Sequence, residues 1–174
     1  MGLDMMLYLE VPVDRNDSSH FMRMGDDFIV GDESLMEMVV DLELDDVINV
    51  DDCEFRMSDG RLSVQVAYWR KVNAIHAWFV NNFQGGVDEC QRSEPVDAES
   101  LLYLADLCDQ VIADPSKADE LLPVRSGFFF GPTDYGDYYM DRLAYTSDTL
   151  RKVVASCLSN PKLVGKQFIY QSSW

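Results

Sequence analysis

The sequence predicts an α+β fold: a single domain, residues 1–174, in which an antiparallel or mixed sheet packs against about three helices. Short segments with apolar residues at every second position are interleaved with longer segments whose apolar residues recur at helical spacing. The two types follow one another in an irregular order, unlike the regular alternation of a parallel α/β fold. A length of 174 residues suits one domain, and a hydrophobic fraction of 47% is enough to build its core.

The most informative stretch is residues 62–84, which predicts a strand followed by a helix. Residues 62–69 alternate with the period of a strand. The helix is expected at 71–84, where one apolar stripe is formed by Val72, Ile75, His76, Phe79, Val80 and Phe83. Gly85 and Gly86 predict its end, because glycine readily adopts the backbone of a helix C-cap. The junction between strand and helix is a place where binding sites often lie.

Further strands are expected near residues 5–11, 124–130 and 167–171, and further helices near 98–113 and 134–158. Asp97 has the side chain of an N-cap for the helix at 98–113. The segment at 124–130 holds three consecutive Phe between glycines, which is typical of a strand buried on both faces or of a tight insertion under a loop. Weaker patterns predict short strands at 27–30 and 91–96, a short helix at 34–42 and an extended chain at 47–57.

The sequence lacks the signatures of several functional classes. No run of about 18 apolar residues is present, and the N-terminus does not have the pattern of a signal peptide. The cysteines, Cys53, Cys90, Cys108 and Cys157, form no Cys-x-x-Cys pair, which favours reduced thiols in an intracellular protein. No phosphate-binding loop, zinc-protease motif or nucleophile elbow occurs, and residues 41–52 lack the Gly and Glu of a calcium loop. We therefore expect neither a metal nor a cofactor.

The negative charge is concentrated near the N-terminus. Of the formal net charge of −17, residues 1–59 contribute −14 and residues 60–174 contribute −3. The charge is densest in seven acids that we take as candidate partner-binding residues: Asp41, Glu43, Asp45, Asp46, Asp51, Asp52 and Glu54. Interleaved apolar residues such as Leu42 and Ile48 are expected to hold this segment against the domain, so that its carboxylates form a fixed array. Such an array can imitate the phosphate charges of DNA and so bind a basic groove on another protein. The alternative interpretation is a solvated acidic face that binds no partner.

A second set of residues suggests a different site at the strand–helix junction. It combines basic, aromatic and polar side chains that are suited to a phosphate or a small ligand: Tyr68, Trp69, Arg70, Lys71, Asn73, His76, Ser126, Tyr135 and Tyr138. The structural interpretation of the same residues places Trp69 and Phe79 in the core, makes His76 a hydrogen-bonded core histidine, and leaves Arg70 and Lys71 in solvent. His76 lies in the apolar stripe and Arg70 points roughly away from it, which argues against one substrate touching both.

Four parts of the chain together resemble a known group of proteins. They are Met1-Gly-Leu-Asp-Met5, the Tyr-Trp-Arg-Lys-x-Asn-x-Ile-His-x-Trp-Phe segment at 68–79, the Leu-Leu-Pro…Ser-Gly-Phe-Phe-Phe-Gly block at 121–131, and Tyr-Gln-Ser-Ser-Trp at 170–174. The combination is similar to an uncharacterised family of small phage and prophage proteins. The resemblance covers most of residues 62–174 and little of residues 12–60, so the acidic segment is interpreted as an elaboration. It implies a phage or bacterial cytoplasmic setting and assigns no catalytic residue.

These patterns favour a non-enzymatic interaction protein of the phage type, which inhibits a host nucleic-acid-binding or defence protein in the bacterial cytoplasm. The expected partner is a host or phage protein with a basic surface, without direct binding to nucleic acid or membrane. The alternative is a small-ligand or nucleotide-phosphate binding protein, or a hydrolase, that uses the junction at 68–76 and the loop at 126–138. A third hypothesis is a structural or accessory phage protein. Salt-sensitive partner binding indicates the first function, whereas a concave pocket at the junction indicates the second.

Overall fold

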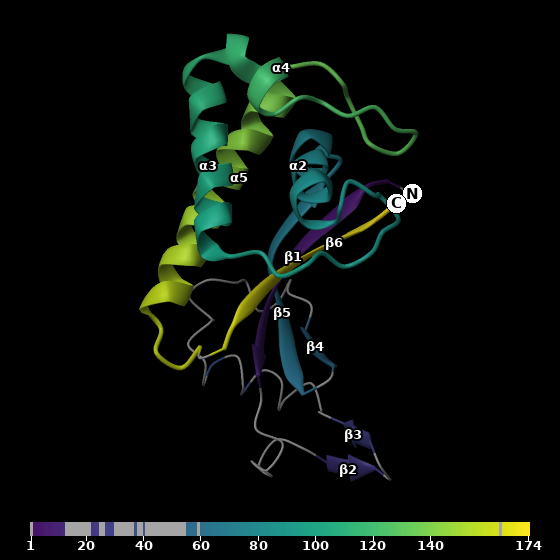
Figure 1. The fold of residues 1–174 in the computed structure, drawn as a ribbon, viewed down its shortest axis with the longest axis vertical. Helices are drawn as coiled ribbons and strands as arrows, with labels where there is room; N and C mark the ends of the chain where they lie inside the picture. Colours follow the sequence, from purple (N-terminus) through teal and green to yellow (C-terminus); the bar gives the residue numbers. More distant parts are fainter. Residues whose placement is uncertain are drawn as a thin grey trace.

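The computed structural model describes residues 2–12, 22–24, 27–29, 37, 40, 55–58, 60–163 and 165–174. Within these residues the main sheet has four antiparallel strands in the order β4-β5-β1-β6. Its strands are β1 (Asp4–Pro12), β4 (Phe55–Ser58), β5 (Arg61–Arg70) and β6 (Gln167–Ser173). A second antiparallel pair consists of β2 (Met22–Met24) and β3 (Asp27–Ile29). Asp4 of β1 lies opposite Ser173 of β6, so the two ends of the chain are neighbours (Figure 1).

The pairing of β1 with β5 is interrupted by a β-bulge between Leu7 and Tyr8 of β1, where β5 contains one residue more. An extra residue shifts the alternation of side chains along the rest of a strand. As a result, Tyr68 is exposed although the uninterrupted sequence pattern groups it with the buried Leu62, and its neighbour Trp69 is buried.

Three helices of the described chain are long, namely α2 (Asn73–Phe83), α3 (Ala98–Ala113) and α5 (Asp137–Ser159). A short helix α4 (Ala118–Leu121) lies between α3 and α5 in the sequence. Helices α3 and α5 pack side by side (Figure 1). Helix α3 begins at its N-cap Asp97, whose carboxylate accepts a hydrogen bond of 2.7 Å from the backbone N–H of Ser100.

The core joins α2, the sheet and α5. Phe79 of α2 is fully buried and stacks on Tyr170 of β6, with ring centroids 4.1 Å apart and an angle of 3° between the rings. Trp69 of β5 donates its indole N–H to the Thr146 hydroxyl of α5 at 3.0 Å. The apolar stripe predicted for α2 therefore faces inward, and the predicted core positions of Trp69 and Phe79 are confirmed.

The predicted α+β fold is confirmed, with the strands at 5–11, 62–69 and 167–171 and the helices at 71–84, 98–113 and 134–158 all present within a few residues of the expected ends. Of the weaker patterns, 27–30 corresponds to β3, and 91–96 contributes one isolated bridge from Val96 to Phe168. Most of 34–42 and of 47–57 lies outside the described residues, although β4 covers the end of the latter.

The predicted strand at 124–130 is wrong, because this segment is a loop between α4 and α5. It pairs with no strand of the described sheet. Phe130 turns inward and is buried, whereas Phe128 is 95% exposed, so the run of Phe does not fill two buried faces of a sheet.

Within the described residues, no helix has both the length and the apolar composition needed to cross a membrane. The described cysteines, Cys90, Cys108 and Cys157, are free thiols, and Cys53 lies outside the described residues. Burial raises the pKa of the Cys108 thiol to about 12 and that of Cys157 to about 11, which makes both thiols unreactive near neutral pH.

Candidate functional site

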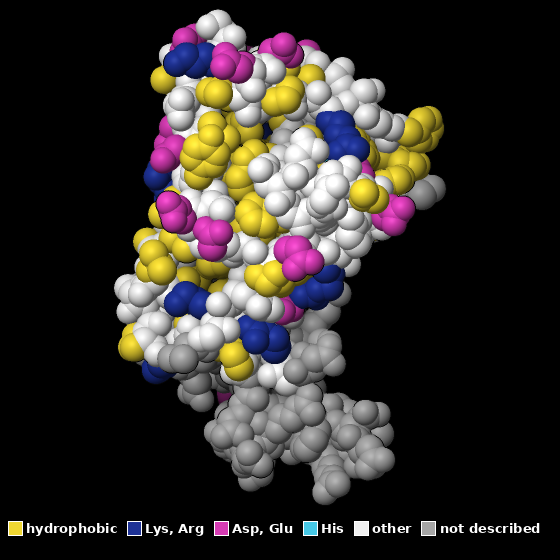
Figure 2. Space-filling model, in the orientation of Figure 1, with side chains coloured by type: hydrophobic (Ala, Val, Ile, Leu, Met, Phe, Trp, Pro, Cys, Tyr) yellow, Lys and Arg dark blue, Asp and Glu magenta, His cyan; other side chains and the backbone are white. Residues whose placement is uncertain are grey.

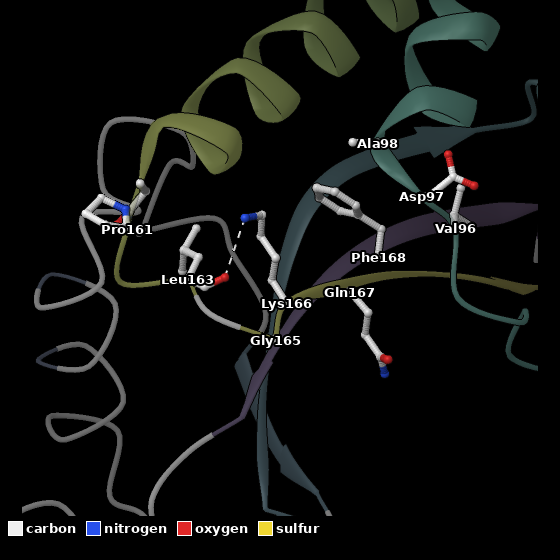
Figure 3. Close-up of a pocket in the computed structure, with 10 residues that line it drawn as sticks. Val96, Asp97, Ala98, Pro161, Leu163, Gly165, Lys166, Gln167 and Phe168 are labelled. Carbon is white, nitrogen blue, oxygen red and sulfur yellow. Dashed lines mark hydrogen bonds between the residues drawn. The ribbon is translucent and has the colours of Figure 1, made fainter.

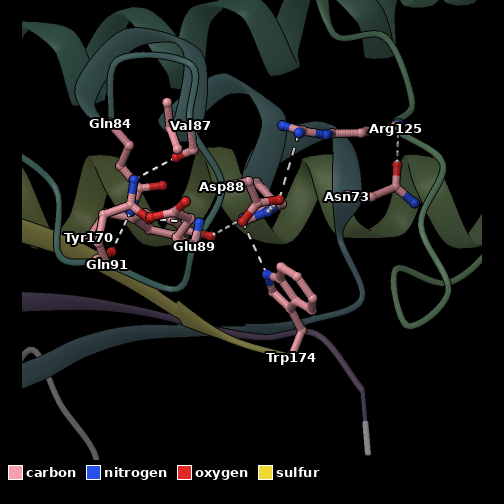
Figure 4. Close-up of polar contacts among 10 residues, drawn as sticks. Asn73, Gln84, Val87, Asp88, Glu89, Gln91, Arg125, Tyr170 and Trp174 are labelled. Carbon is pink, nitrogen blue, oxygen red and sulfur yellow. Dashed lines mark hydrogen bonds and ion pairs between the residues drawn. The ribbon is translucent and has the colours of Figure 1, made fainter.

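A polar network surrounds the buried His76 on α2. Figure 4 shows its members Asp88, Arg125 and Trp174. The Nδ1 atom of His76 lies 2.8 Å from the Tyr170 hydroxyl, and its Nε2 lies 2.9 Å from Oδ2 of Asp88. The other oxygen of Asp88 accepts a hydrogen bond of 3.0 Å from the indole N–H of Trp174. The guanidinium of Arg125 lies 3.7 Å from Asp88 Oδ2. The network therefore connects α2, the loop after it, the loop between α4 and α5, and the end of β6.

Burial favours the neutral forms of His76 and Tyr170 in this network. Burial lowers the pKa of the His76 imidazole, and the hydrogen bond to the Asp88 carboxylate opposes this effect only in part. Burial also raises the pKa of the Tyr170 hydroxyl well above its ordinary value. Both ring nitrogens of His76 have partners and the ring is 0% exposed. The interpretation of His76 as a hydrogen-bonded core histidine is confirmed, and in this arrangement the ring is not accessible to a substrate.

Asn73, at the start of α2, fastens the loop that precedes α5. Its side-chain amide donates to the carbonyl oxygens of Phe130 at 3.0 Å and Pro132 at 2.8 Å. Its side-chain oxygen accepts a hydrogen bond of 2.9 Å from the backbone N–H of Arg125. The side chain is buried, so these three bonds replace contacts with water that the loop backbone would otherwise make. One asparagine thus fixes the loop on both sides of its tip.

Phe130 and two glycines determine the shape of this loop. The backbone N–H of Phe130 donates to the carbonyl oxygen of Gly127 at 3.2 Å, which closes a turn. A Cβ atom on Gly127 would lie 2.6 Å from the Phe130 ring, and Gly131 has a φ of 87°. A side chain at position 127 would clash with the Phe130 ring, and one at position 131 would strain the left-handed backbone. The Phe130 ring packs edge-on against His76, with centroids 5.1 Å apart, and so connects the loop to the buried network.

On the exposed side of the junction, the polar groups already bind one another. The Tyr68 hydroxyl donates to Asp4 Oδ1, and the Arg70 guanidinium lies 3.5 Å from the same oxygen. The Tyr138 hydroxyl donates to the backbone oxygen of Arg70 at 2.6 Å. Lys71 has a left-handed backbone with a φ of 57°, and this conformation redirects the chain from β5 into α2. Arg70 is exposed, as expected, and Lys71 is half-buried.

The cavity at this junction is too small for a phosphate group. It lies at the start of α2, has a volume of about 10 Å³, and is bordered by Lys71, Tyr138 and Arg142 among others. Such a volume holds about one water molecule. The Arg142 guanidinium lies 5.6 Å from the ring centres of both Tyr138 and Tyr145, so these rings already surround its charge.

A larger cavity, of about 520 Å³, lies elsewhere, between the end of α5, the start of α3 and β6 (Figure 3). It has one basic residue, Lys166, whose ammonium group lies 3.5 Å from the carbonyl oxygen of Leu163. Its acidic residue, Asp97, is engaged as the N-cap of α3. None of the residues predicted for a ligand site lines this cavity.

A second polar cluster, around Glu10 of β1, was missed by the sequence reasoning. The Glu10 carboxylate accepts hydrogen bonds from Ser63 at 2.6 Å and Gln167 at 3.1 Å, and it pairs with Arg92 and Arg61. Burial raises the pKa of this carboxyl, but the three hydrogen bonds from Ser63, Gln167 and Arg92 outweigh burial and lower it overall. The available signal was an acid at the end of an otherwise apolar strand pattern. The cluster ties β1, β5 and β6 together.

The predicted sites have different outcomes. The seven candidate partner-binding acids, residues 41–54, lie outside the described residues, so their role stays a prediction. The nine residues of the alternative site do not surround one cavity. Trp69 and His76 are core residues, and the Tyr135 hydroxyl donates to the Asp119 carboxylate of α4 at 2.9 Å. Ser126 is exposed on the loop between α4 and α5. Asn73 holds the backbone of that loop and is not available as a ligand contact.

Among the described residues, no group of three or more His, Cys, Asp or Glu is placed to hold a metal ion. No family model, curated protein or solved structure matches the chain.

Proposed function

We propose that this protein is a non-enzymatic interaction protein whose acidic segment, residues 41–54, binds a basic surface on a protein partner. The sequence resemblance implies a phage setting, in which the partner is a nucleic-acid-binding or defence protein of the host. The acidic segment inhibits this partner by occupying the partner's basic groove. The observation that carries the proposal is the charge distribution, with −14 of the net −17 in residues 1–59. A localised field of this kind attracts a basic partner and repels nucleic acid.

The described junction supports the proposal indirectly. A small-ligand function needs a concave site with polar groups that are available to the ligand. At the junction, His76 and Asn73 are buried and bound to other parts of the chain, and the adjoining cavity is about 10 Å³. Several polar residues that suggested a ligand site, among them Asn73 and His76, thus have structural partners. This favours interaction with a macromolecule over phosphate binding.

The test is capture of proteins from a bacterial lysate at low and moderate salt. The parent is compared with a variant in which Asp45, Asp46, Asp51 and Asp52 are changed to Asn. We expect the parent to capture a basic protein, in a way that weakens with salt, and the variant to lose it.

A matched control removes the same number of charges from exposed positions elsewhere: Glu94→Gln, Glu120→Gln, Asp141→Asn and Asp148→Asn. If the local array matters, this control captures the partner as the parent does. Equal capture by the variant with the changed acidic segment would contradict the proposal, whereas equal loss in both variants would reduce it to a general charge effect.

A further inference from the structure

We propose that the loop formed by residues 124–131 is a preformed docking element that inserts the Phe128 side chain into an apolar pocket of a partner protein. The inference deepens the proposed function, since it assumes a protein partner, but it concerns residues other than the acidic segment. The two surfaces can therefore be tested separately.

The first observation is the exposure of Phe128. Its side chain is 95% exposed. Figure 1 shows the loop between α4 and α5 extending away from the helices, and Figure 2 shows hydrophobic side chains at the corresponding place on the surface. The Phe128 ring meets that of Phe129 edge to face, with centroids 4.8 Å apart, but it is not part of the core. The fold therefore does not require a large apolar side chain at position 128. Aromatic residues are enriched at the centres of protein interfaces, where a few anchors supply most of the affinity.

The second observation is the set of hydrogen bonds that hold the loop on either side of Phe128. Asn73 binds the backbone at Arg125, Phe130 and Pro132, and the Phe129 carbonyl oxygen accepts a hydrogen bond of 3.1 Å from the backbone N–H of Leu3. The backbone is therefore held both before and after Phe128. A held aromatic side chain loses less conformational entropy on docking than one on an unrestrained loop. The combination of an exposed ring and a fixed backbone is that of an interface anchor.

The charge of the chain selects the kind of partner. A net charge of −17 opposes approach to anionic lipid and association with a second copy of the chain. The basic residue within the loop, Arg125, has its guanidinium directed to Asp88 rather than to a lipid headgroup. A protein that combines an apolar pocket with neutral or basic surroundings matches both the ring and the charge. We therefore take the partner of this loop to be a different protein, rather than a lipid membrane or a second copy of the chain.

The experiment begins with the full chain in bacterial cells, carrying the photo-crosslinking amino acid p-benzoylphenylalanine in place of Phe128. The matched control carries it in place of Tyr103, which is 56% exposed on α3. A protein that crosslinks at position 128 but not at 103 is purified, and its affinity is measured for the parent, Phe128→Ser, Phe128→Leu and Tyr103→Ser. We expect Phe128→Ser to weaken binding about tenfold or more, and the other two variants to bind within about threefold of the parent.

Thermal melts accompany each variant, and Phe128→Ser is expected to melt as the parent does because the side chain is exposed. Absence of a crosslinked protein at position 128, or equal affinity of Phe128→Ser and the parent, overturns the inference. Flotation of the parent but not of Phe128→Ser with phosphatidylglycerol vesicles overturns it in favour of a membrane. Self-association that Phe128→Ser abolishes overturns it in favour of a second copy.

The acidic variant separates this inference from the proposed function. If changing Asp45, Asp46, Asp51 and Asp52 to Asn abolishes binding of the partner and Phe128→Ser does not, the proposed function stands and the docking loop is wrong. If only Phe128→Ser abolishes binding, the docking loop stands and the acidic segment is not the binding surface.

Discussion

Arg125 is held by Asn73 through a hydrogen bond of 2.9 Å from its backbone N–H to the asparagine side-chain oxygen. The guanidinium of the same Arg125 faces Asp88, which in turn binds His76. One loop residue is thus connected to both polar residues on the inner part of α2, by its backbone to Asn73 and by its side chain to the His76 network. The polar residues of this helix, which the sequence suggests as ligand contacts, position the loop that exposes Phe128.

Replacing Asn73 by Ala removes three hydrogen bonds from a buried position and leaves loop groups without partners. We expect the free energy of unfolding to fall by about 2–4 kcal/mol, with partial relief if water enters. Urea unfolding measures the change. The control is Asn82→Ala on the same helix, where an exposed side chain binds only the Trp78 carbonyl oxygen, so a loss below about 0.5 kcal/mol is expected. Equal losses in the two variants would mean that Asn73 does not anchor the loop.

The stack of Phe79 on Tyr170 predicts a large effect of truncation in the core. Phe79→Ala should lower the free energy of unfolding by about 3–5 kcal/mol, because it removes a fully buried ring and leaves a cavity. Phe128→Ala is the matched control, since the same truncation at a 95% exposed position should change little. If the two variants unfold at the same urea concentration, the stripe of α2 is not part of the core.

The buried His76 predicts a loss of stability in mild acid. Burial lowers the pKa of His76 in the folded protein below its ordinary value of 6.5, so the unfolded chain binds a proton at a higher pH than the folded one. The free energy of unfolding should therefore be fully retained above about pH 6.5 and fall as the pH decreases from there towards the folded-state pKa. Urea unfolding between pH 8 and pH 5.5 measures it. This window avoids Glu10, whose lowered pKa removes stability only below about pH 4.5.

The variant His76→Gln isolates the contribution of this histidine. It should be less stable at pH 8, because it disrupts the bonds to Tyr170 and Asp88, but its stability should change less between pH 8 and pH 5.5. The assignment is wrong if the variant keeps the full pH dependence of the parent, or if the parent becomes more stable as the pH falls.

Replacing Arg70 and Lys71 together by Ala should preserve the fold. The Arg70 side chain is 56% exposed and its pair with Asp4 is near the surface, so its loss should cost less than about 1 kcal/mol. Thermal melts with and without inorganic phosphate test both roles of this pair. We expect phosphate to shift neither protein. A rise in melting temperature for the parent alone would contradict the structural interpretation and favour phosphate binding.

Much of the fold was predictable because α2, α3 and α5 carry apolar residues at helical spacing, and the longer strands carry apolar residues at every second position. The loop at 124–131 was not, because its shape depends on Asn73, which is about fifty residues away in the sequence. The local sequence shows three aromatic residues between glycines. It does not show that Asn73 binds the loop carbonyl oxygens, or that Phe130 is buried while Phe128 is exposed.

For the candidate site, the sequence places His76 among apolar residues and so predicts a buried, hydrogen-bonded ring. Its partners Asp88 and Tyr170 were not predictable. Asp88 lies in a loop without periodicity, and the hydroxyl of Tyr170 reaches the histidine only after β6 pairs with β1 at the other end of the chain. Spacing along one helix cannot reveal contacts between segments that are brought together by the sheet.

The most direct test of the proposed function is competition for the captured partner. The purified partner is bound to a labelled DNA duplex and titrated with the parent, with the variant in which Asp45, Asp46, Asp51 and Asp52 are changed to Asn, and with the control that removes four charges from the helices and the loop before α3. If the acidic segment occupies the basic groove, the parent and the control displace the DNA and the variant does not. Displacement by the variant at the same concentration as the parent, or DNA that stays bound while the parent saturates the partner, would contradict the account.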